Sequence, residues 1–246
     1  MDAAPAPKPS SVPVQTSNNG TINLQNADER IVRCALEKLA DKSTGVEDYR
    51  DAFRILGVEL GRVLARDLLD ANADEIMLVC ASEDADWLAT GVESGIGKGR
   101  LRKSVYWSTR ETIYKDGNGE RLEISPIVKA YEEPIENCKW LVIVKSIISS
   151  SCVVKSQLTR LIGKTNPKRI AILAPVMYKD GVANLMREFP ESITNKFEVK
   201  TFAVDEDRLD NGEVVPGIGG MVYARLGLVD EVAKNSYIPE MVLARL

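Results

Sequence analysis

Three serines and a lysine lie together in the middle of the chain, next to a short apolar run. The run Trp140–Val144 is followed by Lys145, and Ser149, Ser150 and Ser151 precede a helix-length segment. A loop between a strand and a helix can bind phosphate, because the first backbone N–H groups of the helix point at the anion and hydroxyls donate as well. The lysine adds a positive charge. An ordinary turn whose serines cap the helix is the alternative.

A second segment suited to ligand binding is rich in glycine and follows an acidic stretch that begins at Asp205. Its central residues are Val215, Pro216, Gly217, Ile218 and Gly219. Glycines let a backbone approach a flat ligand closely, so this loop could present N–H and C=O groups to the edge of a nucleobase. A glycine-rich turn that joins two elements is the alternative.

The composition excludes several kinds of chemistry. The 246 residues include no histidine, which rules out Ser-His-Asp and Cys-His nucleophiles and zinc sites that contain histidine. The four cysteines form no CxxC pair, and we predict reduced thiols and no metal site. The formal net charge of −4 argues against a protein that coats nucleic acid or an anionic membrane.

The first 26 residues are rich in Pro, Ala, Ser and Asn, without a hydrophobic period, and they predict a disordered tail. They show neither a secretory signal nor a transit peptide, so we expect a cytoplasmic protein. No apolar run is long enough to span a bilayer. We assign residues 27–227 to one domain and residues 228–246 to a C-terminal extension, which either packs on that domain or docks a partner.

The periodicity changes along the domain. Apolar residues at helical spacing predict a helix that begins near Asp28 and a second one that contains Phe53 to Leu68. Later the apolar runs are short and rich in β-branched residues, and most are separated by helix-length segments. These runs are 75–81, 140–144, 169–175 and 198–204. The alternation predicts an α/β fold with a central, mainly parallel sheet flanked by helices.

Two weaker strand candidates, 104–109 and 122–129, interrupt this alternation. A Lys-Asp-Gly-Asn-Gly turn at 115–119 separates them and predicts a protruding flap hairpin. In an open parallel sheet, ligands bind beyond the carboxyl ends of the strands. The loops 82–86, 145–151, 176–180 and 205–220 are therefore the expected site.

Over roughly residues 28–246 the chain resembles the uracil phosphoribosyltransferase family. Residues 203–220, AVDEDRLDNGEVVPGIGG, are similar to the C-terminal signature of that family, from its Ala-Val-Asp-Glu segment to its Val-Pro-Gly-Leu-Gly-Asp. Residues 39–44 and 48–54 also fit its N-terminal pattern. The resemblance implies a type I phosphoribosyltransferase fold with a base-binding hood built from the C-terminal segment.

The resemblance also implies a reaction. Uracil and phosphoribosyl pyrophosphate would give UMP and pyrophosphate with Mg²⁺, as in pyrimidine salvage. Main-chain groups around Val215, Gly217 and Gly219 would contact uracil, and Arg110 falls where the family carries a flap arginine that helps to hold pyrophosphate. Members of the family form dimers or higher oligomers, so a homo-oligomer is expected.

The sequence departs from the family in the loops that bind phosphoribosyl pyrophosphate. Lys145 replaces an acidic residue, and Ser150, Ser151 and Cys152 stand in for Thr-Gly-Gly. Where the family has Arg-Ala-Gly, residues 82–86 read SEDAD, and we expect their three carboxylates to repel pyrophosphate. Gly220 replaces an aspartate.

These departures favour a catalytically degenerate homologue that binds uracil or a nucleotide such as UMP, or that serves as an assembly subunit. An active transferase remains an alternative, with Lys145, the serines and Arg110 as anion ligands and Mg²⁺ as its cofactor. A pure structural scaffold is the third possibility. Enzymatic activity is therefore left open at this point, and we expect no nucleic-acid or membrane partner.

Overall fold

The computed structural model describes residues 27–246 apart from 115–120, 210–212, 216 and 219–221, and the structural statements below concern these residues. The predicted N-terminal tail and the predicted hairpin turn at 115–119 lie outside them. Within the described residues, no helix is both long enough and apolar enough to cross a membrane.

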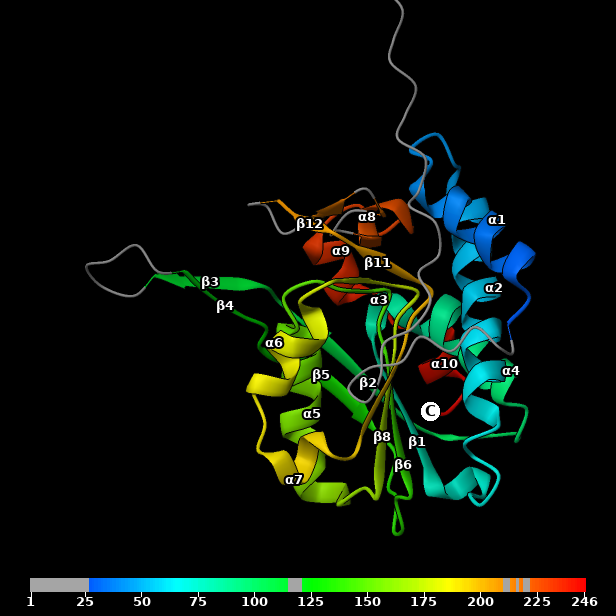
Figure 1. Ribbon diagram of the computed structural model, residues 1–246, viewed down its shortest axis with the longest axis vertical. Helices are drawn as coiled ribbons and strands as arrows, with labels where there is room; N and C mark the ends of the chain where they lie inside the picture. The colour runs from blue at the N-terminus through cyan, green and yellow to red at the C-terminus, as the bar shows by residue number, and fades with distance from the viewer. Residues whose placement is uncertain (1–26, 115–120, 210–212, 216, 219–221) are drawn as a thin grey trace, which may run out of the picture.

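A six-stranded sheet forms the centre of the molecule, in the order β10-β8-β6-β1-β2-β5 (Figure 1). All neighbouring strands are parallel except β2 and β5, which are antiparallel. The strands are β1 Ile76–Ala81, β2 Arg102–Ser108, β5 Ile127–Glu132, β6 Trp140–Val144, β8 Arg169–Leu173 and β10 Phe197–Lys200. The predicted α/β fold with a mainly parallel sheet is confirmed.

Three short strands form a second parallel sheet that follows on from the first. They are β7 Ile147–Ile148, β9 Val176–Tyr178 and β11 Ala203–Asp205. The prediction of one strand over 198–204 is therefore wrong, because the chain breaks between β10 and β11. The break has a physical cause: the N–H groups of Phe202 and Ala203 both donate to the carbonyl of Pro175, at 3.1 and 3.0 Å. Pro175 has no N–H of its own and interrupts the neighbouring strand at the same level.

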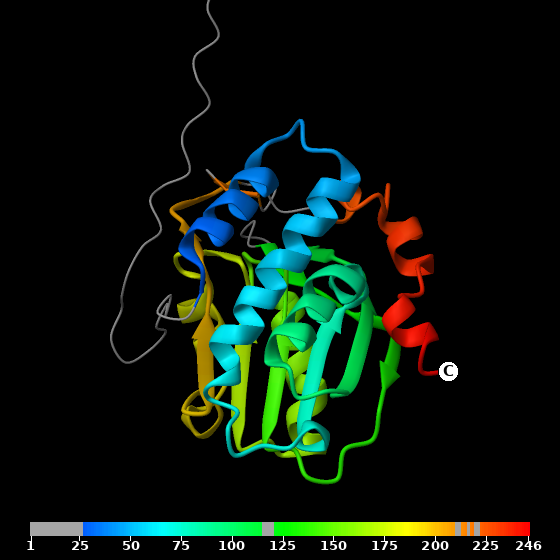
Figure 2. The ribbon, with the colours of Figure 1, turned by 90° about the vertical axis from the view of Figure 1, so that its right-hand side faces the viewer.

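Helices cover both faces of the sheet (Figures 1 and 2). On one face lie α1 Glu29–Ala40, α2 Val46–Ala65 and α4 Thr90–Ile96, and on the other lie α5 Cys152–Thr165, α6 Gly181–Arg187 and α7 Glu191–Thr194. The first helix begins where the sequence predicts, because the Asp28 carboxylate accepts hydrogen bonds from the N–H groups of Arg30 and Ile31. Each face has its own apolar core.

The chain enters a helix directly after β1. Helix α3 Ser82–Asp84 continues through a π-helical turn, Ala85–Ala89, into α4. This helical segment packs closely on α2: a Cβ added to Gly57 would overlap the carbonyl oxygen of Leu88. Residues 82–86 are therefore helical, and the sequence prediction of a loop there is wrong, although Glu83 does line the cavity described below.

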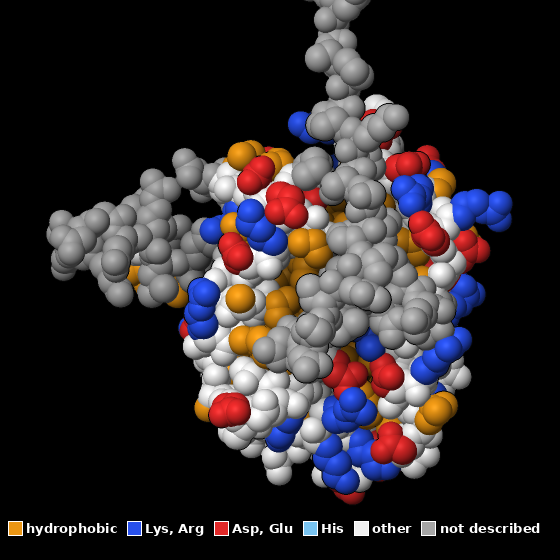
Figure 3. Space-filling view, in the orientation of Figure 1, with side chains coloured by type: hydrophobic (Ala, Val, Ile, Leu, Met, Phe, Trp, Pro, Cys, Tyr) orange, Lys and Arg blue, Asp and Glu red, His pale blue; other side chains and the backbone are white. Residues whose placement is uncertain are grey.

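A flap hairpin is present, but the strands predicted for it are wrong: 104–109 belongs to β2 of the central sheet, and 122–129 is divided between β4 and β5. The hairpin consists of the antiparallel strands β3 Glu111–Tyr114 and β4 Arg121–Ile124, which project from the body of the molecule in Figure 1. The segment that resembles the hood contains β12 Asp207–Arg208, β13 Val214–Val215 and α8 Val222–Arg225. On the face drawn in Figure 3, basic and acidic side chains are interspersed.

The C-terminal extension packs on the domain through α9 Glu231–Ser236 and α10 Glu240–Leu243. The indole N–H of Trp107 donates to the carbonyl of Tyr237 at 2.7 Å, and the Tyr237 ring stacks on Trp87. Asp86 accepts hydrogen bonds from the N–H groups of Glu240 and Met241 at the start of α10. The Asp86 carboxylate therefore faces the extension, and the expectation that it repels pyrophosphate is wrong.

Candidate functional site

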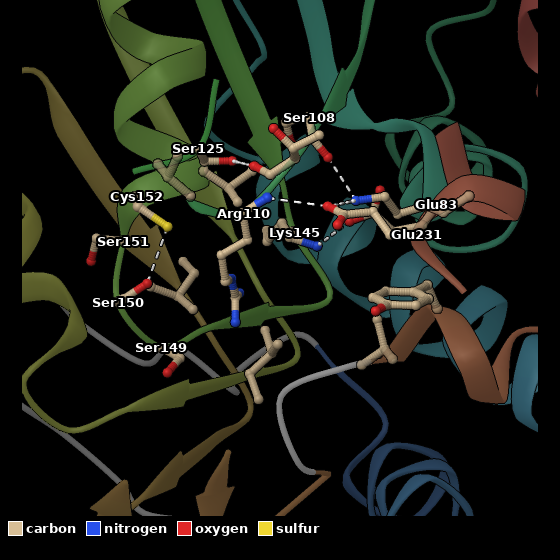
Figure 4. Close-up of a pocket in the computed structure, with 18 residues that line it drawn as sticks. Glu83, Ser108, Arg110, Ser125, Lys145, Ser149, Ser150, Ser151, Cys152 and Glu231 are labelled. Atoms are coloured by element: carbon tan, nitrogen blue, oxygen red, sulfur yellow. Dashed lines mark hydrogen bonds and ion pairs between the residues drawn. The ribbon is translucent and has the colours of Figure 1, made fainter. Parts of the chain in front are cut away.

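A cavity of about 300 Å³ lies at the carboxyl edge of the sheet, where β1, β2 and β6 end (Figure 4). This volume is at the lower end of the range of roughly 300–1,000 Å³ for small-molecule sites. Its walls come from residues 147–151, the start of α5, residues 108–110 at the end of β2, and helices α8 and α9. The position agrees with the rule that ligands bind beyond the carboxyl ends of parallel strands.

The N-terminus of α5 opens into this cavity. Cys152, Val153 and Val154 line it, and the first turn of the helix contains no acidic residue. The first N–H groups of a helix have no partner within the helix, and the helix dipole favours an anion in front of them. No side chain caps this helix at Ser151. The alternative prediction, an ordinary turn in which a serine caps the helix, is therefore wrong for Ser151, the residue at the N-cap position.

Ser151 has the backbone conformation of a glycine. Its φ of 65° is left-handed, a region that costs a residue with a Cβ about 1–2 kcal/mol. Its hydroxyl donates to the carbonyl of Gly181 at 2.8 Å. This position therefore has a glycine-like backbone conformation with a serine side chain.

Ser149, Ser150 and Arg110 complete the polar side of the cavity. The hydroxyl of Ser149 accepts from Arg208 Nε of the hood at 2.9 Å, and Ser150 Oγ lies 3.2 Å from Cys152 Sγ. The Arg110 side chain extends into the cavity in Figure 4, and its backbone N–H donates to Glu231. Among the described residues, its guanidinium has no ion-pair partner.

Lys145 is buried beside two carboxylates. Its Nζ lies 2.6 Å from Asp84 Oδ2 and 3.2 Å from Glu83 Oε1, and it also donates to Ser146 Oγ. Burial alone would lower the pKa of Lys145, but the two carboxylates outweigh it and raise the pKa above its usual value. The lysine and the acidic residues, which the sequence presents as separate losses, thus form one compensated cluster.

This cluster changes two expectations. Asp84 is directed to Lys145 and to the N–H of Ser146, so it does not face a ligand's phosphate as expected. Lys145 lines the cavity, but its charge is already matched. The residues do not suit a Mg²⁺ ion at this place, since the ammonium stands where a cation would contact both carboxylates. No group of three metal-binding side chains occurs in the part of the chain that the structure describes.

The described residues of the base loop, Val215, Gly217 and Ile218, are not part of the cavity lining. Pro216 and Gly219 are outside the described residues. Gly217 packs against the carboxylate of Asp205 so closely that a Cβ there would overlap it. Asp205 is buried at the end of β11, and burial raises its pKa to about 6.

Sequence reasoning missed two residues of the cavity. The sequence predicts Glu83 to repel pyrophosphate rather than to pair with Lys145, and no local pattern marks Lys234 of α9 as part of the site. Lys234 is buried, lines the cavity and donates to the carbonyl of Ser108 at 2.6 Å. Ser108 and Lys234 are 126 residues apart in the sequence, so no local pattern predicts their contact.

Comparisons with known proteins show the fold. No protein-family model matches the chain, and no curated protein is significantly similar to it in sequence. Among solved structures, the AQ2163 protein from Aquifex aeolicus matches with a TM-score of 0.60 and 16% identity, over 82% of this chain and 96% of that one. A hypoxanthine phosphoribosyltransferase from Staphylococcus aureus matches with a TM-score of 0.39 and 15% identity, over 67% of this chain and 76% of that one.

At the level of fold, the chain thus shares the mainly parallel α/β architecture of the AQ2163 protein. Sequence identities of about 16% establish a shared fold and no shared function. The comparisons show no particular family, and the uracil phosphoribosyltransferase assignment is taken up below as a proposal.

Proposed function

We propose that this protein is a catalytically degenerate homologue of uracil phosphoribosyltransferases that binds a uridine nucleotide such as UMP. The observation that carries the proposal is the N-terminus of α5, which opens into a cavity at the carboxyl edge of the sheet. Ser150 and the guanidinium of Arg110 line the same cavity. Together these groups supply backbone N–H, hydroxyl and cationic donors, which is the set that binds a phosphate monoester.

The charge cluster supports the loss of transferase chemistry. A transferase must hold pyrophosphate and a metal next to the ribose. Here Lys145 forms an ion pair with Asp84 at the strand ends, so the ammonium group stands where a metal would contact the carboxylate. The base preference rests on the resemblance of residues 203–220 to the family's base loop. The hood lies near the phosphate side, since Arg208 contacts Ser149.

Calorimetric titration tests the binding. We expect UMP to bind more tightly than uridine or uracil, since the phosphate makes the best-supported contacts. Arg110→Ala should weaken UMP binding roughly ten-fold, the effect of a charge-assisted hydrogen bond. Arg187→Ala is the matched control, because this arginine of α6 contacts Asn184 and does not line the cavity. Absence of heat with UMP, uridine, uracil and inorganic phosphate would reject the proposal.

The active transferase is tested by UMP formation from uracil and phosphoribosyl pyrophosphate with Mg²⁺ at high protein concentration. We expect no turnover. Turnover that is lost in Arg110→Ala would establish the active alternative and overturn the degeneracy. The resemblance to the family adds a homo-oligomer and a role as an assembly subunit to the proposal. Analytical ultracentrifugation with and without UMP measures the oligomeric state and shows whether the nucleotide changes it.

A further inference from the structure

One carboxylate in the cavity has an oxygen without a partner. Glu83 is 8% exposed and lines the cavity, and its Oε1 accepts from Lys145. Its Oε2 is buried and has no hydrogen-bond partner within the described residues. Because Glu83 lines the cavity, a ligand bound there can supply the missing donor. Buried acceptors are nearly always paired, and an exception in a pocket points to a missing partner.

The neighbouring charges show what kind of partner is missing. Asp84 uses one oxygen for Lys145 and the other for the N–H of Ser146, so Glu83 is the carboxylate with spare capacity. Burial raises the pKa of Glu83, but the charges of Lys145 and Lys234 outweigh it and lower the pKa, which keeps the carboxylate ionised. Lys145 Nζ already occupies the place between Glu83 and Asp84 where a metal ion would contact both carboxylates. A neutral O–H donor is therefore the partner that fits the remaining oxygen of Glu83.

The two sides of the cavity thus differ in hydrogen-bonding character. Figure 4 shows Ser150 and Cys152 on one side and Glu83 with Lys145 on the other. The first side offers donors for an anion, and the second offers an acceptor. A ligand with a phosphate at one end and hydroxyl groups at the other would satisfy both sides.

We infer that Glu83 binds the sugar hydroxyl groups of a phosphorylated polyol, such as the ribose 2′- and 3′-hydroxyls of a ribonucleotide, whose phosphate lies at the start of α5. The inference rests on the proposed nucleotide binding and adds a specificity for the sugar. It assigns to Glu83 a binding role in place of the repulsive one expected from the sequence. Glu83 lies in α3, directly after β1, and Lys145 directly follows the neighbouring strand β6.

Ligand analogues test this on the natural protein. Calorimetry compares UMP with 2′,3′-dideoxy-UMP, which has the same base and phosphate but neither hydroxyl. We expect the dideoxy compound to bind roughly ten-fold more weakly, because hydrogen bonds to a charged acceptor are lost. Ribose 5-phosphate should compete with UMP, since it carries both of the required ends.

The variant Glu83→Gln gives a result that general damage to the fold would not. It should weaken UMP binding roughly ten-fold, leave dideoxy-UMP unchanged, and leave inorganic phosphate binding unchanged or tighter, because a negative charge is removed. Glu93→Gln is the control, since Glu93 forms a comparable ion pair with Lys103 at 2.7 Å and does not line the cavity.

The outcomes separate the two proposals. Equal affinity of the natural protein for UMP and dideoxy-UMP overturns the role of Glu83 while nucleotide binding stands. If Glu83→Gln weakens the binding of UMP and of dideoxy-UMP by the same factor, the role of Glu83 is also overturned, because the loss of affinity then does not depend on the ribose hydroxyls. If UMP, ribose 5-phosphate and phosphate all fail to bind, both proposals are wrong.

Discussion

The chain segments that follow β1 and β6 lie at neighbouring strand ends and offer opposite chemistry. We call them the β1 exit (Ser82–Asp84) and the β6 exit (Lys145–Ser151). The β1 exit turns at once into a helix, so the polar groups that it presents are side-chain carboxylates. The β6 exit runs through a loop to the start of α5 and presents hydroxyls and backbone N–H groups. The difference teaches that the cavity has an acceptor side and a donor side.

Lys145 joins the two exits, and its removal should have the largest effect. In Lys145→Met, Asp84 and Glu83 lose their buried counter-charge, and the free energy of unfolding should fall by about 3–5 kcal/mol. Denaturant unfolding followed by circular dichroism measures this. Lys155→Met is the control: its pair with Glu188 is nearly half exposed, so the change should stay below about 1 kcal/mol. A loss that is no larger in Lys145→Met than in this control would show that the exits are independent.

The hood contacts the β6 exit through Arg208 and Ser149. Asp205, which is buried at the end of β11 next to the hood, predicts a dependence of stability on pH. Burial raises the pKa of Asp205 from 3.8 to about 6, so the folded state holds this proton more tightly than the unfolded chain. This contribution to stability is complete below about pH 4 and is lost as the pH rises through about 6. It amounts to no more than about 3 kcal/mol.

The comparison of natural protein with Asp205→Asn between pH 4 and pH 7 isolates this contribution. The asparagine does not titrate, so we expect the variant to gain stability relative to the natural protein as the pH rises. Parallel stability curves for the two proteins would contradict the prediction. They would mean that the carboxylate beneath Gly217 has an ordinary pKa in the folded protein.

Much of the fold follows from local sequence signals. The cap at Asp28 and the apolar spacing of α2 predict the first two helices because both depend on residues within a few positions of each other. The short apolar runs predict the parallel sheet, since strands covered on both faces must be apolar throughout. The break after β10 was missed because it depends on Pro175, which lies in the neighbouring strand segment.

The candidate site was predictable only on its donor side. The serine loop and the start of α5 are contiguous in sequence, and Arg110 was found through the resemblance to the family's flap. The acceptor side depends on an ion pair between residues 61 positions apart, Lys145 and Asp84. Considered separately, Lys145 and Asp84 each predict the loss of a phosphate site. Charges that compensate one another across a sheet edge are recognised only when the strand order is known.

Ser151 provides the smallest and most local test of the comparison. Ser151→Gly and Ser151→Ala both remove the hydroxyl that donates to Gly181, but only alanine keeps a Cβ at a φ of 65°. The glycine variant should therefore be more stable than the alanine variant by about 1–2 kcal/mol in denaturant unfolding. Gly163→Ala in α5, where a Cβ meets open space, should show the opposite order and gain up to about 1 kcal/mol. If both positions prefer alanine, the β6 exit lacks the glycine-like backbone that directs its N–H groups into the cavity, and the donor side of the site is lost with it.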